Sequence, residues 1–195
     1  MTKDWKTRTK LVHEGSRRSQ YGEMAEAIFL TQGFAYPTAE SAESRFVQAG
    51  EDEFIYARYG NPTVAMFEDR IASLEGVEAG FATASGMAAV NGALMALVKA
   101  GDHVVSSRAL FGSCLYILED VLGRFGVEIS LVDGRDLNAW KAAVRPDTKL
   151  VFCESVSNPT LEVIDLGAVA NIAHANGAFL VVDNVFAPPI FSYAA

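Results

Sequence analysis

The sequence is poor in cysteine and basic residues. Its two cysteines, Cys114 and Cys153, lie far apart and form no C-x-x-C pair, so they provide no disulfide framework. Isolated thiols of this kind fit a reducing compartment, and we expect a cytoplasmic protein. The formal charge is −8 and the chain contains no run of lysine and arginine. This argues against a nucleic-acid surface, because phosphate binding requires clustered basic side chains.

Several other features are also missing. The longest apolar stretch, 87–98, is interrupted by Asn91 and Gly92 and is shorter than the roughly 20 residues that span a membrane. The charged start, MTKDWKTRTK, has no apolar signal-peptide core. GxGxxG, GxxxxGK[ST] and GxSxG are all absent, which argues against dinucleotide, P-loop and hydrolase sites. The histidines have no Cys or His partners at ligand spacing, so we expect no metal site.

The chain after residue 60 alternates between apolar strands and helices. Asn61 is a plausible N-cap, Pro62 suits the first helical position and Gly76 ends that helix. The predicted strands that follow are 80–85, 102–107, 127–133, 149–155 and 178–184, and the helices between them are 86–101, 113–126, 137–146 and 166–177. This alternation predicts a three-layer α/β fold, with a mainly parallel sheet and helices on both faces. Residues 1–60 are polar and irregular and predict an extended arm.

Ligands bind at the carboxyl ends of the strands in such a sheet. Ser85, Gly86 and Met87, in ATASGMAAV, join a predicted strand to a helix. Free N–H groups at a helix N-terminus form an anion site suited to phosphate, although a plain tight turn would have the same sequence. Tyr56 and Arg58, in YARYGNPT, suit a phosphate clamp or, alternatively, a solvated loop arginine beside buried aromatics.

Three further residues lie at or after predicted strand ends. Asn158, in CESVSNPT, either marks an Asn-Pro turn or binds a phenolic oxygen of a ligand; Glu154 ends the strand before it. Asp183, in FLVVDNVF, is a loop acid or a carboxylate held beside a protonated ring nitrogen, as pyridoxal phosphate chemistry requires. Phe111 could stack on such a ring or pack in the core.

Four stretches, taken together and in this order, resemble the Cys/Met-metabolism family of pyridoxal phosphate enzymes, which have the fold-type I architecture. They are YARYGNPT, ATASGMAA, ESVSNP and VVDNVFA. The similarity covers the chain from about Gly22 onward. It implies pyridoxal 5'-phosphate as cofactor, a small amino-acid ester as substrate, and a homodimer or homotetramer. The charge and the short apolar stretches predict no nucleic-acid and no membrane partner.

The resemblance also implies roles for the phosphate-binding residues. Tyr56 and Arg58 would reach the cofactor phosphate of a neighbouring subunit, so the arm would contribute to that subunit's site. The backbone N–H groups of Gly86 and Met87, next to Ser85, would hold the phosphate within the subunit.

The remaining implied roles concern the cofactor ring. Phe111 would stack on it, Asn158 would bond its 3-hydroxyl and Asp183 would pair with its nitrogen. Two positions depart from the family pattern. Val156 stands where many members have proline, and Phe111 stands where the lyases usually have tyrosine. Loss of that hydroxyl, which is thought to move protons, makes a lyase less expected.

The segments LTQGFAYPTAESAESRF and RALFGSCLYIL most resemble the sulfhydrylase members of the family. The implied activity is a γ-replacement in methionine biosynthesis, in which O-succinylhomoserine or another activated homoserine ester reacts with sulfide to give homocysteine. A cystathionine γ-synthase, a cystathionine or methionine γ-lyase, and a non-catalytic fragment are the alternatives. A nucleotide-binding oxidoreductase is less expected because its glycine fingerprint is missing.

The resemblance implies a Schiff-base lysine, in a Ser-x-Thr-Lys motif, roughly one helix and strand beyond Asp183. The last lysine of this sequence is Lys149. We therefore expect residues 61–195 to be the N-terminal part of the cofactor-binding domain, without the catalytic lysine, and residues 1–60 to be the arm that precedes it.

Overall fold

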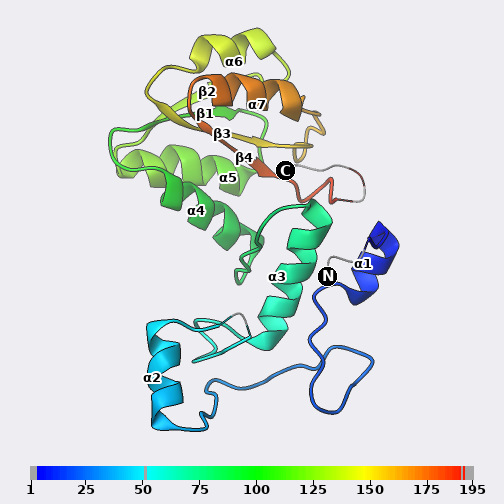
Figure 1. Cartoon of the computed structure of the whole chain (residues 1–195). Coiled ribbons are helices and arrows are strands. Elements are labelled where there is room, and N and C mark those ends of the chain that lie inside the picture. The colour runs from blue at the N-terminus through cyan, green and yellow to red at the C-terminus, as the bar shows by residue number, and fades with distance from the viewer. Residues whose placement is uncertain (1–3, 51, 190, 192–195) are drawn as a thin grey trace. The chain divides into compact units, whose positions relative to one another are not determined.

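The computed structural model of the chain describes residues 4–50, 52–189 and 191, and divides into two compact units between Ala82 and Thr83 (Figure 1). The first unit contains the helices α1 (Thr7–His13), α2 (Ala39–Val47) and α3 (Pro62–Glu75). The helices of the second unit are α4 (Gly86–Leu97), α5 (Gly112–Tyr116), the π-helix η1 (Ile117–Leu122), α6 (Leu137–Ala143) and α7 (Leu166–Ala175). Its strands are β1 (His103–Ser107), β2 (Glu128–Val132), β3 (Thr148–Glu154) and β4 (Phe179–Asp183).

Helix α3 of the first unit has the ends that the sequence predicts. The side chain of Asn61 accepts a hydrogen bond from the backbone N–H of Thr63 at 2.8 Å, Pro62 is the first helical residue, and Gly76 ends the helix with a φ of 77°. A side-chain acceptor at the N-cap and a left-handed glycine at the C-cap satisfy backbone groups that an isolated helix leaves unpaired. These predictions are confirmed.

Residues 1–60 are less irregular than predicted, because they include α1 and α2. Thr38 caps α2, with its hydroxyl oxygen accepting a hydrogen bond from the backbone N–H of Ser41 at 3.1 Å. Helix α1 is held to α3 by the ammonium group of Lys10, which donates to the carbonyl oxygen of Ser73 at 3.1 Å. Such short helices depend on caps and tertiary contacts more than on hydrophobic periodicity. The boundary after residue 60, and the arm's reach to a neighbouring subunit, stay predictions.

The second unit is an α/β domain built on a four-stranded parallel sheet in the order β2-β1-β3-β4. Helices α4 and α5 lie on one face of this sheet, and α6 and α7 lie on the other (Figure 1). The predicted fold class is confirmed. Because each crossover helix returns the chain to the same edge, all four strands end at one edge of the sheet.

The predicted strand at 80–85 is wrong. No residue of this segment pairs with a strand in the part of the chain that the structure describes, and Phe81 is 89% exposed. The backbone N–H of Ala82 donates to the carboxylate of Glu68 at 2.7 Å, where a strand would donate to a neighbouring strand. The predicted helix 113–126 is also modified, since it forms as α5 followed directly by η1.

Hydrophobic residues fill both sides of the sheet. One core contains Leu94, Val104, Leu118, Leu150 and Phe152, and the other contains Val105, Trp140, Val151, Cys153 and Val169. Successive residues of a strand point to opposite faces. A strand that is covered on both faces therefore has consecutive apolar residues, as β3 has from Leu150 to Cys153, whereas β1 has only Val104 and Val105 between polar residues. Among the described residues, no helix is both long enough and apolar enough to cross a membrane.

A polar cluster lies at the opposite end of β1 from the strand's carboxyl end. His103 is fully buried, with Nδ1 2.8 Å from the hydroxyl of Thr148 and Nε2 2.9 Å from the hydroxyl of Ser130. Burial, and to a smaller degree the charge of Arg145, hold the pKa of His103 below its usual value. The folded protein therefore favours the neutral imidazole.

We predict that protonation of His103 destabilises the protein in acid. The stability that the neutral ring contributes is fully present above the unfolded-state pKa of about 6.5 and is lost as pH falls toward the lower folded-state pKa. The His103→Gln variant should lose about 1–3 kcal/mol at neutral pH, through disturbed hydrogen bonds. Because glutamine does not titrate, the melting temperature of this variant should fall less than that of the wild type between pH 7.5 and 5.

The control is His174→Gln, because His174 is exposed on α7. Its melting temperature should follow the wild-type pH dependence. Equal slopes for wild type and His103→Gln would contradict the assignment.

Candidate functional site

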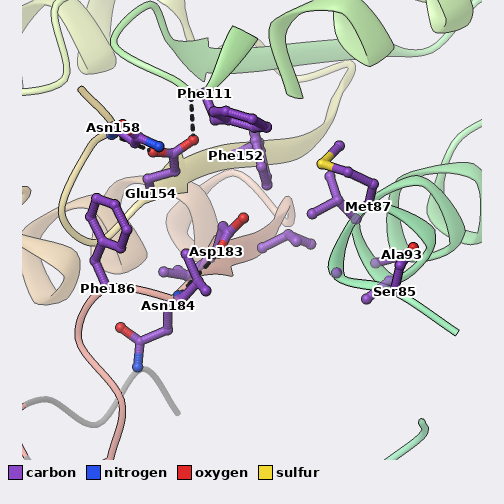
Figure 2. Close-up of a pocket in the computed structure, with 16 residues that line it drawn as sticks. Ser85, Met87, Ala93, Phe111, Phe152, Glu154, Asn158, Asp183, Asn184 and Phe186 are labelled. Atoms are coloured by element: carbon purple, nitrogen blue, oxygen red, sulfur yellow. Dashed lines mark hydrogen bonds between the residues drawn. The ribbon is translucent and has the colours of Figure 1, made fainter. Parts of the chain in front are cut away.

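A pocket of about 620 Å³ lies at the carboxyl edge of the sheet in the second unit (Figure 2). Its walls come from the N-terminus of α4, the loop after β1 and the ends of β3 and β4. The chain leaves β1 toward β2 on one side and leaves β3 toward β4 on the other. Ligands bind in α/β sheets at such a switch point, where the loops diverge. Six predicted site residues line this pocket: Ser85, Gly86, Met87, Phe111, Asn158 and Asp183.

The N-terminus of α4 forms one wall. Ser85 is its N-cap, and the hydroxyl oxygen of Ser85 accepts a hydrogen bond from the backbone N–H of Ala88 at 3.2 Å. The N–H groups of Gly86 and Met87 have no hydrogen-bond acceptor among the described residues. Free first-turn N–H groups and the helix dipole together favour an anion such as a phosphate.

Phe111 and Asn158 come from different loops, and the carboxylate of Glu154 lies between them (Figure 2). Phe111 follows β1, and its backbone N–H donates to Oε1 of Glu154 at 2.6 Å. The backbone N–H of Asn158 donates to Oε2 at 2.8 Å. The side chain of Phe111 is 43% exposed, which leaves its ring available to a ligand.

Glu154 is a pocket residue to which the sequence assigned no function. It ends β3 and is only 3% exposed. Burial raises the pKa of Glu154, the two backbone hydrogen bonds oppose that rise, and the charge of Asp183 adds to it. Its position, as an acid ending a buried apolar strand, was visible in the sequence. Its hydrogen-bond partners were not.

Asp183 ends β4 and is paired in register with Glu154 on β3. Its Oδ1 accepts a hydrogen bond from the backbone N–H of Val185 at 3.1 Å. The loop after β4 is held by Ser155, whose backbone N–H donates to the Asp183 carbonyl at 3.0 Å and whose hydroxyl donates to Oδ1 of Asn184 at 2.7 Å. No lysine, arginine or histidine lines the pocket among the described residues. Two carboxylates without a basic neighbour favour a cationic group on a ligand.

The remaining walls are apolar. Phe152, Val90, Ala93, Val181 and Phe186 contribute to them. Apolar walls with a few convergent polar groups are typical of a small-molecule site, and these would suit a flat ring. Phe186 belongs to a stretch that the sequence singled out, but no role was predicted for it.

Tyr56 and Arg58 belong to the first unit. The guanidinium carbon of Arg58 lies 5.2 Å from the ring centre of Tyr56 and 5.0 Å from that of Tyr59. A cation over aromatic faces at this distance is a favourable contact. Their binding of a phosphate in a neighbouring subunit stays a prediction.

The ligand atoms of Cys114, Glu154 and Asp183 lie within 4.8 Å of one another, the one such group among the described residues. Cys114 is fully buried. Burial, followed by the charges of Asp183 and Glu154, raises the pKa of its thiol to about 12. A metal binds the thiolate, which is disfavoured here. We assign no metal to this group, and the absence of a metal site stays a prediction.

Comparison with known proteins identifies the family. The family model described as "Cys/Met metabolism PLP-dependent enzyme" matches residues 8–194. The chain belongs to this family.

Curated relatives include a sulfhydrylase and a lyase. The chain is 50% identical over 180 residues to the O-succinylhomoserine sulfhydrylase of Mycobacterium tuberculosis, covering 92% of this chain and 44% of that protein. It is 41% identical over 182 residues to the L-methionine gamma-lyase of Fusobacterium nucleatum, covering 93% of this chain and 46% of that protein. The chain thus spans less than half the length of these curated relatives.

A solved structure shares the fold. A crystal structure from Campylobacter jejuni that contains N'-pyridoxyl-lysine-5'-monophosphate matches with a TM-score of 0.89 and 29% identity, over 96% of this chain and 46% of that one. The family uses pyridoxal phosphate.

The groups that line the pocket fit this cofactor. Pyridoxal phosphate has an anionic phosphate, a flat ring and a ring nitrogen that can carry a proton. The pocket has two free N–H groups at the start of α4, an exposed face of Phe111 and the carboxylate of Asp183. The chemistry of each group complements one part of the cofactor.

Burial of both cysteines in the cores of the second unit leads to a prediction for their thiols. Cys114 and Cys153 are fully buried, and burial raises the pKa of each to about 12. Because the thiolate is the reactive form, iodoacetamide at pH 8 should leave both unlabelled in the native protein. Peptide mass spectrometry should find both labelled after unfolding in guanidinium, which is the control. Rapid native labelling of Cys114 would contradict the burial described for it.

Proposed function

We propose that this chain is the N-terminal portion of a pyridoxal phosphate enzyme that combines O-succinylhomoserine with sulfide to give homocysteine and succinate. The observation that carries this proposal is the 50% identity to an O-succinylhomoserine sulfhydrylase across 92% of the chain. The pocket supports it, because its polar groups suit the family's cofactor.

In this proposal, each wall of the pocket holds one part of the cofactor. The N–H groups of Gly86 and Met87 bind the phosphate and Phe111 stacks on the ring. The side chain of Asn158 bonds the 3-hydroxyl, and Asp183 pairs with the ring nitrogen. When bound, pyridoxal phosphate supplies an electron sink for the negative charge left when the substrate loses its α-proton.

Asp183 has the central electrostatic role in this proposal. Its carboxylate keeps a proton on the ring nitrogen, and a protonated ring withdraws electrons more strongly. No basic side chain competes for that carboxylate among the described lining residues. Glu154 next to it adds negative potential, which further favours the protonated nitrogen.

Phe111 favours γ-replacement over elimination. Its ring provides a stacking face but has no hydroxyl with which to move a proton. In the lyases that this chain resembles, tyrosine usually stands at this position. The rival function is a cystathionine synthase or a lyase of the same family, and the 41% identity to an L-methionine gamma-lyase is the observation that favours it.

The proposed assembly is a homodimer or homotetramer. Tyr56 and Arg58 would complete the phosphate site of a neighbouring subunit, so a single subunit would hold the cofactor less firmly. Closed symmetric assemblies of this kind are the common form of soluble oligomers.

We predict that Asp183→Ala nearly abolishes turnover in the full-length protein and weakens cofactor binding. Loss of one charge-assisted hydrogen bond costs about 1.5–3 kcal/mol, and the transition state should be affected at least as much. Steady-state assays and cofactor titrations measure the two effects. The control is Asp136→Ala, which removes the carboxylate that caps α6 outside the pocket. Near-normal turnover of Asp183→Ala would refute its pairing with the ring.

We predict that the full-length protein uses sulfide in preference to cysteine. Parallel assays with O-succinylhomoserine should show homocysteine forming faster with sulfide than cystathionine forms with cysteine. The comparison should use equal thiol concentrations and the same enzyme preparation. Faster formation of cystathionine would assign the protein to the rival function.

A further inference from the structure

Two loops that leave neighbouring strands are tied together by one side chain. Phe111 follows β1 and Asn158 follows β3, and the chain continues from these strands toward opposite sides of the sheet. The loop after β3 has hydrogen bonds of its own, such as that from the backbone N–H of Ser157 to the carbonyl of Glu162 at 3.0 Å, but these do not reach the loop after β1. Glu154 provides the link, since Oε1 accepts from Phe111 N–H at 2.6 Å and Oε2 accepts from Asn158 N–H at 2.8 Å.

The ionised form of Glu154 suits this bridge. A carboxylate offers two oxygens that both accept hydrogen bonds, so it can bind two backbone donors at once. Hydrogen bonds to a charged acceptor are shorter and stronger than neutral ones. Glu154 is only 3% exposed, so water screens these bonds little. Because Glu154 belongs to β3 itself, the bridge is anchored to a buried strand.

The bridge fixes two groups that face the same pocket. The ring of Phe111 lies on one side of the Glu154 carboxylate and Asn158 lies on the other, while Asp183 projects from the adjacent strand (Figure 2). In the proposed function, these three residues contact one rigid ring. Their mutual spacing therefore decides whether all three contacts form at once.

We propose that Glu154 is a positioning residue, which sets the stacking face of Phe111 and the amide of Asn158 at the spacing that a pyridine ring requires. This inference rests on the proposed function, because it takes the cofactor ring as the ligand. Glu154 acts through the two backbone N–H groups, whereas Phe111, Asn158 and Asp183 contact the ligand.

The test uses pyridoxamine 5'-phosphate as the probe, because it has the phosphate, ring nitrogen and 3-hydroxyl but needs no covalent bond to a lysine. Glu154→Gln keeps the size of the side chain, but its amide NH₂ cannot accept the second hydrogen bond. By titration calorimetry of the full-length protein, this variant should bind the probe at least about tenfold more weakly than wild type. Glu162→Gln is the matched control, because Glu162 lies outside the pocket and pairs with Arg135 at 3.3 Å. It should bind like wild type.

A spectroscopic measurement separates positioning from general loss of stability. The circular dichroism that the protein induces in the bound probe depends on the ring's orientation against Phe111 and Asn158. At saturating probe, Glu154→Gln should change this band, and Glu162→Gln should leave it as in wild type. An unchanged band in Glu154→Gln would overturn the positioning role, even if the affinity falls.

A mutant cycle then tests whether Glu154 acts through its two partners. In a Phe111→Ala/Asn158→Ala background, the positioned side chains are gone, so adding Glu154→Gln should change probe affinity less than about twofold. A full tenfold loss in that background would overturn the proposal, because Glu154 would then act on the ligand directly or on the whole fold. Wild-type protein that binds no probe would overturn the proposed function together with this inference. Wild-type binding that Glu154→Gln leaves unchanged would overturn the inference alone.

Discussion

Parallel pairing of β3 with both β1 and β4 is the constraint on which the pocket depends. The register places Glu154 beside Asp183, and the shared direction of the strands brings their carboxyl ends to one edge. The crossover helices that make this direction possible also cover both faces of the sheet, and their apolar residues form the two cores. The parallel strands and their crossover helices therefore both stabilise this unit and set the geometry of its pocket.

The charged and polar groups at the carboxyl edge of the sheet determine which kind of ligand it can bind. A buried carboxylate is costly unless hydrogen bonds or a cation compensate for its lost hydration. Among the described residues, Glu154 is compensated by two backbone N–H groups, whereas Asp183 receives one, from Val185. The carboxylate of Asp183 thus keeps capacity for a cationic partner. The backbone N–H groups at the start of α4, in contrast, favour an anion. A ligand with a protonated nitrogen and a phosphate satisfies both, as the family's cofactor does.

Prediction from sequence was weakest where structure depends on single long-range contacts. The segment 80–85 has the composition of a strand, but Ala82 bonds to the side chain of Glu68 and Phe81 is exposed. Helices α1 and α2 were missed because they are short and have no buried residues. Their ends depend on caps and on neighbours such as Ser73, which hydrophobic periodicity does not detect.

The sequence by itself determined the α/β class, the caps of α3 and the placement of Asp183 at a strand end, because these follow from local hydrogen bonding and from continuous apolar strands. It also marked the six residues that the structure gathers in one pocket. Only the tertiary structure decided how the loops around that pocket are tied together. The Glu154–Phe111 hydrogen bond joins residues 43 positions apart. No local pattern predicts such a bond, because it forms only after β1 and β3 have paired.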